Sequence, residues 1–393
     1  MKIYLVGGAV RDELLNLKNT DRDWVVVGET TNSMIAAGFI PVGKDFPVFL
    51  HPQSKEEYAL ARIERKQGTG YHGFICESTK KITLEQDLSR RDLTINAIAK
   101  SMEGKIVDPF NGNKDIQQKQ LRHVSSAFEE DPLRVLRVAR FHAKLAYLGF
   151  TIAKETMSLM QIMSNEKELL SISAERIWQE TVKALKTASP WVYFDTLQSC
   201  GAFNIIFRGI PITSTKNNVW QNSLAVLKSA CTLSQDINIR FAAFIQAFIL
   251  PSVESTLVHE AANPINQVKK ICQNLKLPKT TTQLIVKSCC FKNALNDAKT
   301  LSPQQIDDLF INLNVYRQKK QLERYFLLNQ ASAEALNNPS IIESSILLAK
   351  CYDAAQSQKI NNIENKQLTG KAIGEALRQL RINKIKQIIT NEK

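Results

Sequence analysis

The sequence predicts an α+β protein in which a small mixed sheet near the N-terminus is followed by helices. Over residues 1–120, short apolar runs such as "KIYLV" and "DWVVVG" are separated by turn residues, which is typical of strands. From Asp131 onward apolar residues recur every three or four positions, as in "PLRVLRVARFHAKLAYLG", which is typical of amphipathic helices. We therefore expect the C-terminal two-thirds of the chain to be almost entirely helical.

The composition indicates a globular protein with a polyanionic partner. The apolar fraction of 44% is enough for a core, and the net charge of +13 suggests a partner such as nucleic acid. The most apolar later stretch, "FAAFIQAFIL", is about half a membrane span, so we expect neither a signal peptide nor a membrane anchor. The seven cysteines form no C-x-x-C pair, which favours reduced thiols and a cytoplasmic location.

The first candidate motif is "LVGGAVRD", in which an apolar strand leads into Gly7-Gly8 and then into the start of a helix. Glycine lets an anion approach the backbone closely, and the free N–H groups of a helix start point towards it. Arg11, one turn into the helix, would add a charged donor to the same anion. A simple Gly-Gly turn with a surface arginine is the alternative.

The second motif, "TDRDWVVVG", carries Asp21 and Asp23 just before an apolar run. Residues two apart in a strand point to the same face, so both carboxylates would converge. Such a pair repels itself unless a cation lies between, and oxygen ligands favour Mg²⁺ shared with phosphates. Beside a phosphate-binding turn this predicts two-metal nucleotidyl transfer, although a solvated turn is the alternative. Whether Glu57 is a third metal ligand stays open.

Two later clusters add candidates for nucleotide binding. In "DLSRRDLTINAIA", Arg91 could clamp a triphosphate and Asp92 could accept a hydrogen bond from a ribose hydroxyl. A charged helix start, with Asp92 near the positive end of the helix dipole, is the alternative. In "FEEDPLRVLRVARF", Asp131-Pro132 indicates a helix start that is followed by arginines at three-residue spacing: Arg134, Arg137 and Arg140.

The Asp131–Arg134 pair suggests a means of choosing bases. Arginine offers only donors and an ionised carboxylate only acceptors. Cytosine and adenine each present a donor amine beside an acceptor ring nitrogen, so one Asp–Arg pair would satisfy either base. Guanine and uracil reverse this pattern and would leave unpaired groups. The pair therefore predicts selection of C and A without a template, whereas a solvated, salt-bridged helix is the alternative.

The chain resembles the bacterial CCA-adding enzymes, class II tRNA nucleotidyltransferases of the polymerase-β-like superfamily. The resemblance rests on "LVGGAVRD", "DRDWVVVG", "RRDLTINA", "DPFNG" and "EDPLRVLRVARF", which occur in the expected order. It implies a seahorse-shaped protein with a nucleotidyltransferase head (1–120), a helical neck (121–208), and a helical body and tail (209–393). It also implies the addition of CCA to the 3′ end of tRNA from CTP and ATP, with Mg²⁺. We expect a monomer rather than an oligomer, although the sequence leaves the oligomeric state open.

The resemblance also assigns roles to individual residues. Asp21 and Asp23 would be the catalytic metal ligands, and Glu130, Asp131 and Arg134 would form the base-selecting motif. The other nucleotide contacts would be made by Gly8, Arg11, Arg91, Asp92, Arg137 and Arg140. A further stretch, "SAERIWQE" (173–180), is similar to the neck motif of the family, in which Glu175 and Arg176 would hold helices together.

The chain departs from its longer bacterial relatives in the segment "INIRFAAFIQAFILP" (237–251). Those relatives carry a metal-dependent phosphohydrolase (HD) domain there, but this chain has Gln246 and Ala247 where the His-Asp pair would stand. An amide and a methyl group cannot replace an imidazole and a carboxylate on a metal. We therefore expect a degenerate HD-like body without hydrolase activity, retained for packing and for binding the tRNA elbow.

Two other functions stay open at the level of sequence. A poly(A) polymerase would share the head and the metal site, but "DRDW" and the absence of a long basic extension argue against it. A non-catalytic RNA-binding protein would have no need of the Asp21/Asp23 pair.

Overall fold

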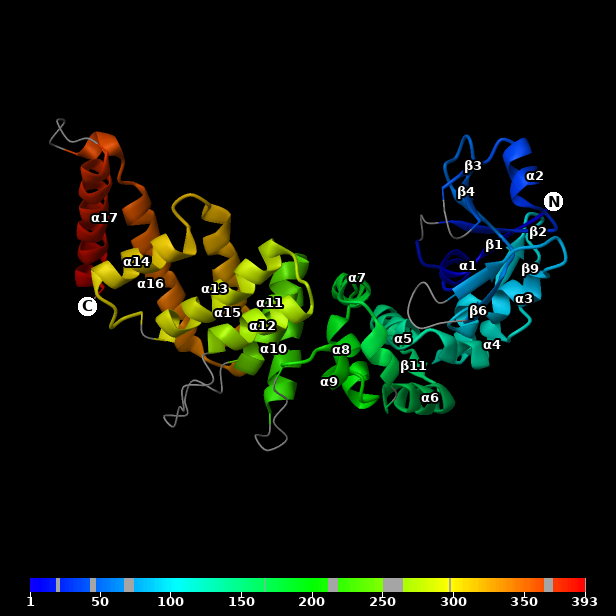
Figure 1. Ribbon diagram of the computed structural model, residues 1–393. Helices are drawn as coiled ribbons and strands as arrows, with labels where there is room; N and C mark the ends of the chain where they lie inside the picture. Colours follow the sequence, from blue (N-terminus) through cyan, green and yellow to red (C-terminus); the bar gives the residue numbers. More distant parts are fainter. Residues whose placement is uncertain are drawn as a thin grey trace. The chain divides into compact units, whose positions relative to one another are not determined.

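The chain forms two compact units, Met1–Arg208 and Gly209–Lys393, so that the predicted head and neck fall in one unit (Figure 1). The division into head, neck and body stays a prediction. Within the described residues, no helix combines the length and apolar character needed to cross a membrane. This computed structural model describes residues 1–18, 22–42, 47–66, 74–165, 167–210, 218–249, 264–296, 298–363 and 370–392.

The first unit is built on the predicted mixed sheet. Within the described residues, its seven strands lie in the order β3-β4-β5-β2-β1-β8-β9. Strands β2 and β5 form a parallel pair, and the other pairs are antiparallel. The strands are β1 (Lys2–Val6), β2 (Asp23–Val27), β3 (Ile40–Pro41), β4 (Val48–Leu50), β5 (Glu57–Leu60), β8 (Ala99–Ser101) and β9 (Ile106–Val107). Two smaller sheets pair β6 (Ile63–Lys66) with β7 (Phe74–Glu77), and β10 (Gln120–Leu121) with β11 (Thr151–Ile152).

The central strand β2 explains why "DWVVVG" is a continuous apolar run. It is paired on both sides, and its alternating side chains enter two different cores. Val25 packs with Val6 and Leu88 on one face, whereas Val26 packs with Met34 and Phe49 on the other. Asp23, at the first position of this strand, is exposed. At Val25 and Val26 the strand is thus buried on both faces.

Short helices connect the strands of the head, and the motif "DPFNG" joins one of them to the sheet. These helices are α1 (Gly8–Leu14), α2 (Thr31–Ala36), α3 (Leu84–Ser89), η2 (Thr94–Asn96) and α4 (Gly112–Gln117). Asp108 accepts hydrogen bonds from the first amides of α4, at 2.7 Å from Gly112 N and 2.8 Å from Asn113 N. A Cβ atom on Gly112 would lie 2.2 Å from the carbonyl oxygen of Thr94, so only glycine permits α4 to approach η2 this closely.

The rest of the first unit is largely helical, as predicted. Its helices are η3 (Ser126–Glu130), α5 (Leu133–Leu145), η4 (Ala146–Leu148), α6 (Lys154–Asn165), η5 (Lys167–Ser171), α7 (Ala174–Leu185), α8 (Pro190–Ser199) and α9 (Phe203–Ile206). The predicted helix start is confirmed, because Asp131 Oδ1 accepts a hydrogen bond from Leu133 N at 3.0 Å. Helix α5 packs against α7 and α8, and this contact brings the neck motif to the arginines of α5.

Only helices occur in the described part of the second unit (Figure 1). They are α10 (Val219–Leu233), α11 (Ile237–Ile249), α12 (Pro264–Asn274), α13 (Lys279–Asn296), α14 (Pro303–Leu313), α15 (Lys319–Leu336), α16 (Pro339–Gln356), η7 (Ile360–Asn362) and α17 (Lys371–Asn391). Helix α10 packs against α11 and α15, and α16 packs against α17. Arg378 of α17 makes ion pairs with Asp307 and Asp308, which ties the last helix to α14.

The HD-like segment is the buried helix α11. Gln246 is fully buried, and within the described chain neither polar atom of its amide has a hydrogen-bond partner. A buried amide without partners costs stability, because its lost hydrogen bonds to water are not replaced. The absence of hydrolase activity stays a prediction.

We predict that Gln246→Met stabilises the second unit by about 1–3 kcal/mol, because it removes an unsatisfied polar group while keeping a similar volume. Chemical denaturation followed by circular dichroism measures this change. Thr281→Val is the matched control: Thr281 is also buried, but its hydroxyl donates to Asn238 Oδ1 at 2.5 Å, so its loss is expected to destabilise. Destabilisation by both substitutions would contradict the interpretation of Gln246.

Candidate active site

A pocket of about 730 Å³ in the first unit collects nearly all the predicted site residues. Asp21 lies outside the described residues, and Glu130 is not among the lining residues. The predicted residues that line it are Gly8, Arg11, Asp23, Arg91, Asp92, Asp131, Arg134, Arg137 and Arg140. Among the described residues, the lining holds nine basic and five acidic side chains, an excess of positive charge that suits a polyphosphate.

The glycine turn forms one wall of this pocket. Gly7 has a φ of 72°, and a Cβ atom there would lie 2.9 Å from Arg91 Nη1. A Cβ atom on Gly8 would lie 3.3 Å from Arg11 Nη2, so each glycine leaves room for one guanidinium. Arg91 Nε is buried and has no hydrogen-bond partner within the described chain. Burial lowers the pKa of Arg91, and Asp87 opposes this shift. An incompletely paired guanidinium at this turn is suited to an anion.

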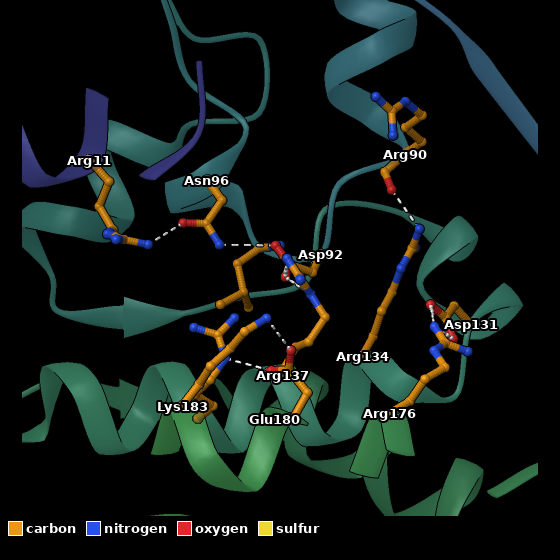
Figure 2. A network of polar contacts seen from close by, with 12 residues as sticks. Arg11, Arg90, Asp92, Asn96, Asp131, Arg134, Arg137, Arg176, Glu180 and Lys183 are labelled. Atoms are coloured by element: carbon orange, nitrogen blue, oxygen red, sulfur yellow. Dashed lines mark hydrogen bonds and ion pairs between the residues drawn. The ribbon is translucent and has the colours of Figure 1, made fainter. Parts of the chain in front are cut away.

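Asp92 is the centre of a hydrogen-bond network that spans the pocket (Figure 2). Its Oδ2 accepts from Nε and Nη2 of Arg137, both at 2.7 Å, and its Oδ1 accepts from Asn96 Nδ2 at 2.9 Å. Burial disfavours ionisation of Asp92, but Arg137 and the hydrogen bond from Asn96 outweigh it and hold its pKa below the ordinary value. Asn96 Oδ1 in turn accepts from Arg11 Nη1 at 2.5 Å. The network therefore joins the glycine-turn helix to α5.

A second buried carboxylate, Glu180 of α7, orients Arg140. Its Oε2 accepts from Arg140 Nε at 2.5 Å, and its Oε1 lies 3.1 Å from Lys183 Nζ. The ring of Phe141 adds a shared apolar surface, with the guanidinium carbons of Arg140 and Arg11 lying 4.1 and 5.1 Å from its centroid. Neither Glu180 nor Phe141 was predicted from the sequence, although "SAERIWQE" and "ARF" contain them. Only the packing of α7 on α5 pairs Glu180 with Arg140.

Asp131 and Arg134 line the same pocket, but each is paired with a different group. Arg176 of α7 donates to Asp131 Oδ2 at 3.0 Å, so the neck motif contacts the proposed base-selecting residue directly (Figure 2). The two terminal nitrogens of Arg134 donate to the carbonyl oxygens of Ala127 at 2.5 Å and Arg90 at 2.6 Å. Arg176 was expected only to hold helices together, whereas it also lines the pocket.

Asp23 and Glu57 form the carboxylate end of the pocket. They are direct partners in the parallel register of β2 and β5, and both are exposed to the pocket. Side chains at paired positions of neighbouring strands project to the same face. Within the described residues, no group of three or more His, Cys, Asp or Glu side chains is arranged to hold a metal. The described residues therefore supply two neighbouring carboxylates, next to the position that Asp21 occupies in the sequence.

Comparison with known proteins identifies the class of protein to which the chain belongs. Residues 3–122 match the family described as "Poly A polymerase head domain", and residues 149–213 match "Probable RNA and SrmB- binding site of polymerase A". Among solved structures, "The structure of CCA-adding enzyme apo form II" has a TM-score of 0.70 at 20% identity, covering 100% of this chain and 91% of that one. "The complex structure of CCA-adding enzyme with ATP" has a TM-score of 0.67 at 22% identity, covering 100% and 89%. The head and its pocket thus define a polymerase-type nucleotidyltransferase.

One curated relative narrows this class of protein to a single family. The "CCA-adding enzyme" of Buchnera aphidicola subsp. Cinara cedri (strain Cc) is 42% identical over 408 residues, which cover 99% of this chain and 98% of the relative. The chain belongs to the family of CCA-adding enzymes.

We predict that Glu180→Gln destabilises the first unit by about 2 kcal/mol at pH 7 and flattens the acid side of its stability profile. Burial opposes ionisation of Glu180, but Arg140 and Arg137 outweigh it and lower its pKa. A carboxyl whose pKa is lowered by folding stabilises the protein above its unfolded pKa, about 4.3, and this contribution is lost as the pH falls through the folded pKa. Melting temperatures measured from pH 7 to pH 3 test this.

Glu343→Gln is the matched control. Glu343 also has a lowered pKa, caused by Lys299, but it is fully exposed, and exposed ion pairs contribute little. Parallel stability profiles for Glu180→Gln and the unmodified protein would contradict the assignment.

Proposed function

We propose that this protein adds C, C and A in order to the 3′ end of tRNA from CTP and ATP, releasing pyrophosphate and using no nucleic-acid template. One observation carries the proposal. Residues predicted to contact the base, the ribose and the triphosphate of a nucleotide line a single pocket. They come from three separate segments of the chain, 5–28, 87–99 and 128–141. Family membership supports the choice of substrates, as does the structural relative that was solved in complex with ATP.

The arginines along helix α5 suggest the order in which the base, the ribose and the triphosphate lie in the pocket. Arg134 is near its start, beside Asp131, and we assign this end to the base. Arg137 follows with its partner Asp92, which we assign to the ribose. Arg140 is on the next turn, and Arg11 lies against the same Phe141 ring, so this end suits the triphosphate. The rise of an α-helix puts about 9 Å between Arg134 and Arg140 along the axis.

Base selection would depend on Asp131 and Arg134 as fixed groups. The backbone carbonyls of Ala127 and Arg90 hold the Arg134 guanidinium, and Arg176 holds the Asp131 carboxylate. Because the guanidinium can only donate hydrogen bonds and the carboxylate can only accept them, the pair presents a single fixed pattern of donors and acceptors. Such a pattern complements C and A and leaves unpaired groups against G and U.

The carboxylate end of the pocket fits a hard divalent cation. Asp23 is exposed at the pocket, Glu57 is its neighbour across the strands, and carboxylate oxygens are the ligands that Mg²⁺ prefers. Asp21 and Asp23 would hold two Mg²⁺ ions, which in nucleotidyl transfer activate the attacking hydroxyl and neutralise the leaving pyrophosphate. Glu57 is a candidate third ligand.

The helical parts of the chain would bind tRNA. Residues 149–213 match an RNA-binding description, and the +13 net charge favours a polyanion. We propose that the HD-like body contributes to this binding and has no hydrolase activity. Hydrolysis of a 2′,3′-cyclic phosphate by the purified protein with nickel or manganese would contradict the second point.

The first test uses tRNA that lacks its last three nucleotides, with each nucleotide alone and with CTP and ATP together. We expect ordered addition of C, C and A, followed by arrest. Asp23→Asn and Asp21→Asn are expected to abolish turnover, because each removes a charged metal ligand, while tRNA affinity changes little. Glu13→Gln, at an exposed position outside the pocket, is the control. An unbounded tail of A would indicate a poly(A) polymerase, and binding without addition would indicate a non-catalytic relative.

The second test concerns base selection. Asp131→Ala and Arg134→Ala are expected to reduce the preference for CTP and ATP over UTP and GTP by about 10- to 100-fold, which is the cost of about one to two unpaired groups. The ratio of kcat/KM values for the four nucleotides measures this preference. An equal loss for all four nucleotides would mean that these residues only support the structure.

A further inference from the structure

Lys144 differs chemically from every other cation of the pocket. Of the nine basic side chains that line it within the described chain, eight are arginines and Lys144 is the ninth. Arginine does not release its proton in proteins, whereas a lysine ammonium can. Among the described residues, Lys144 is therefore the pocket cation that can act as an acid.

The position of Lys144 is fixed by a buried carboxylate. Asp12 of α1, whose side chain is 3% exposed, pairs through Oδ1 with Arg11 Nη2 at 2.7 Å and through Oδ2 with Lys144 Nζ at 3.0 Å. Arg11 and Lys144 are thus bridged by one carboxylate. The Lys144 side chain keeps 38% of its surface exposed and lines the pocket, so its remaining donors can reach a ligand.

The order along α5 puts Lys144 at the triphosphate end. It is one turn beyond Arg140 and about 15 Å along the helix axis from Arg134, at the opposite end from the proposed base contacts. Its neighbour across Asp12 is Arg11, whose guanidinium borders Gly8 of the glycine turn. In the nucleotide order proposed above, a group at this place faces the phosphates rather than the base.

We propose that Lys144 is a catalytic residue that donates a proton to the leaving pyrophosphate; this proposal rests on the nucleotidyl transfer proposed above. The 3′-oxygen of the tRNA forms a bond to the α-phosphorus, and its proton passes to water. The bond from the α-phosphorus to the α,β-bridging oxygen breaks, and its electron pair stays on that oxygen. Lys144 transfers one proton to the pyrophosphate and regains it from water, so that the enzyme is unchanged.

The electrostatic surroundings favour proton release. Burial and the nearby Arg11 lower the pKa of Lys144, Asp12 opposes this shift, and Arg140 adds to it. Glu180 of α7 faces Arg140 and is the next carboxylate in the network. An acid whose pKa is closer to neutral donates its proton more readily, and general acid catalysis typically contributes about 100- to 10,000-fold.

Two substitutions of Lys144 distinguish the effect of losing a proton donor from the effect of losing a positive charge. Lys144→Met is expected to lower kcat for single-nucleotide addition by about 100-fold or more. Lys144→Arg keeps the positive charge and the contact with Asp12. We expect its KM for ATP to equal that of the unmodified enzyme, but its kcat to be at least about 10-fold lower. Full recovery of kcat in Lys144→Arg would overturn the proposal, because charge alone would then be sufficient.

Leaving-group chemistry provides the readout that a structural role would not change. ATP with a difluoromethylene group between the β- and γ-phosphorus atoms has a less basic leaving group than ATP with a methylene group there. A less basic leaving group needs less protonation, so the defect of Lys144→Met is expected to be at least about 10-fold smaller with the difluoromethylene analogue. Equal defects with both analogues would overturn the proposal.

Lys100→Met is the matched control and is expected to keep full activity. Lys100 also makes an ion pair with a carboxylate of α1, Glu13, but it does not line the pocket. Melting temperatures verify that the variants fold. We expect them to fold because none of the substitutions removes the ion pair between Arg11 and Asp12. Failure of the unmodified enzyme to extend tRNA would contradict the proposed function instead, so the two failures are distinguishable.

Discussion

The ion pair between the buried Asp92 and the half-buried Arg137 is the interaction on which the site depends. It joins the segment after α3 to helix α5, and Asn96 extends it to Arg11 on α1. Three stretches that are distant in sequence are thereby held around one pocket. Because Asp92 is 4% exposed and receives hydrogen bonds on both oxygens, Arg137 has a defined position before any ligand arrives. Preorganised groups of this kind are effective because little reorganisation is needed on binding.

The same arrangement recurs around the pocket. Cations concentrated to attract a polyphosphate repel one another, and buried carboxylates offset this repulsion. Asp12 holds Arg11 and Lys144, Asp87 holds Arg90 and Arg91, and Glu180 holds Arg140. Each carboxylate is nearly inaccessible to solvent, and Arg11 is buried with Asp12, whereas Lys144, Arg91 and Arg140 retain exposed surface at the pocket. The carboxylates therefore position the cations without competing with a ligand for access from solvent.

Much of the fold could be predicted from local pattern. The central strand "DWVVVG", the start of α5 after Asp131-Pro132 and the helical C-terminal region all follow from hydrophobic periodicity and turn chemistry. The site was harder, because the supporting residues have no local signature. Glu180 and Phe141 are ordinary positions on amphipathic helices, and Lys144 looks like a surface lysine. Their roles depend on which helix packs beside them.

The sequence by itself determined which chemical groups are available: a glycine turn, paired aspartates at the head of a buried strand, and arginines repeated along one helix face. Only the tertiary structure decided their partners. Asp131 pairs with Arg176, 45 residues away, and Arg134 donates to backbone carbonyls. The physical reason is that helical periodicity sets which face a side chain occupies, whereas the packing of α7 and the head against α5 sets what that face meets.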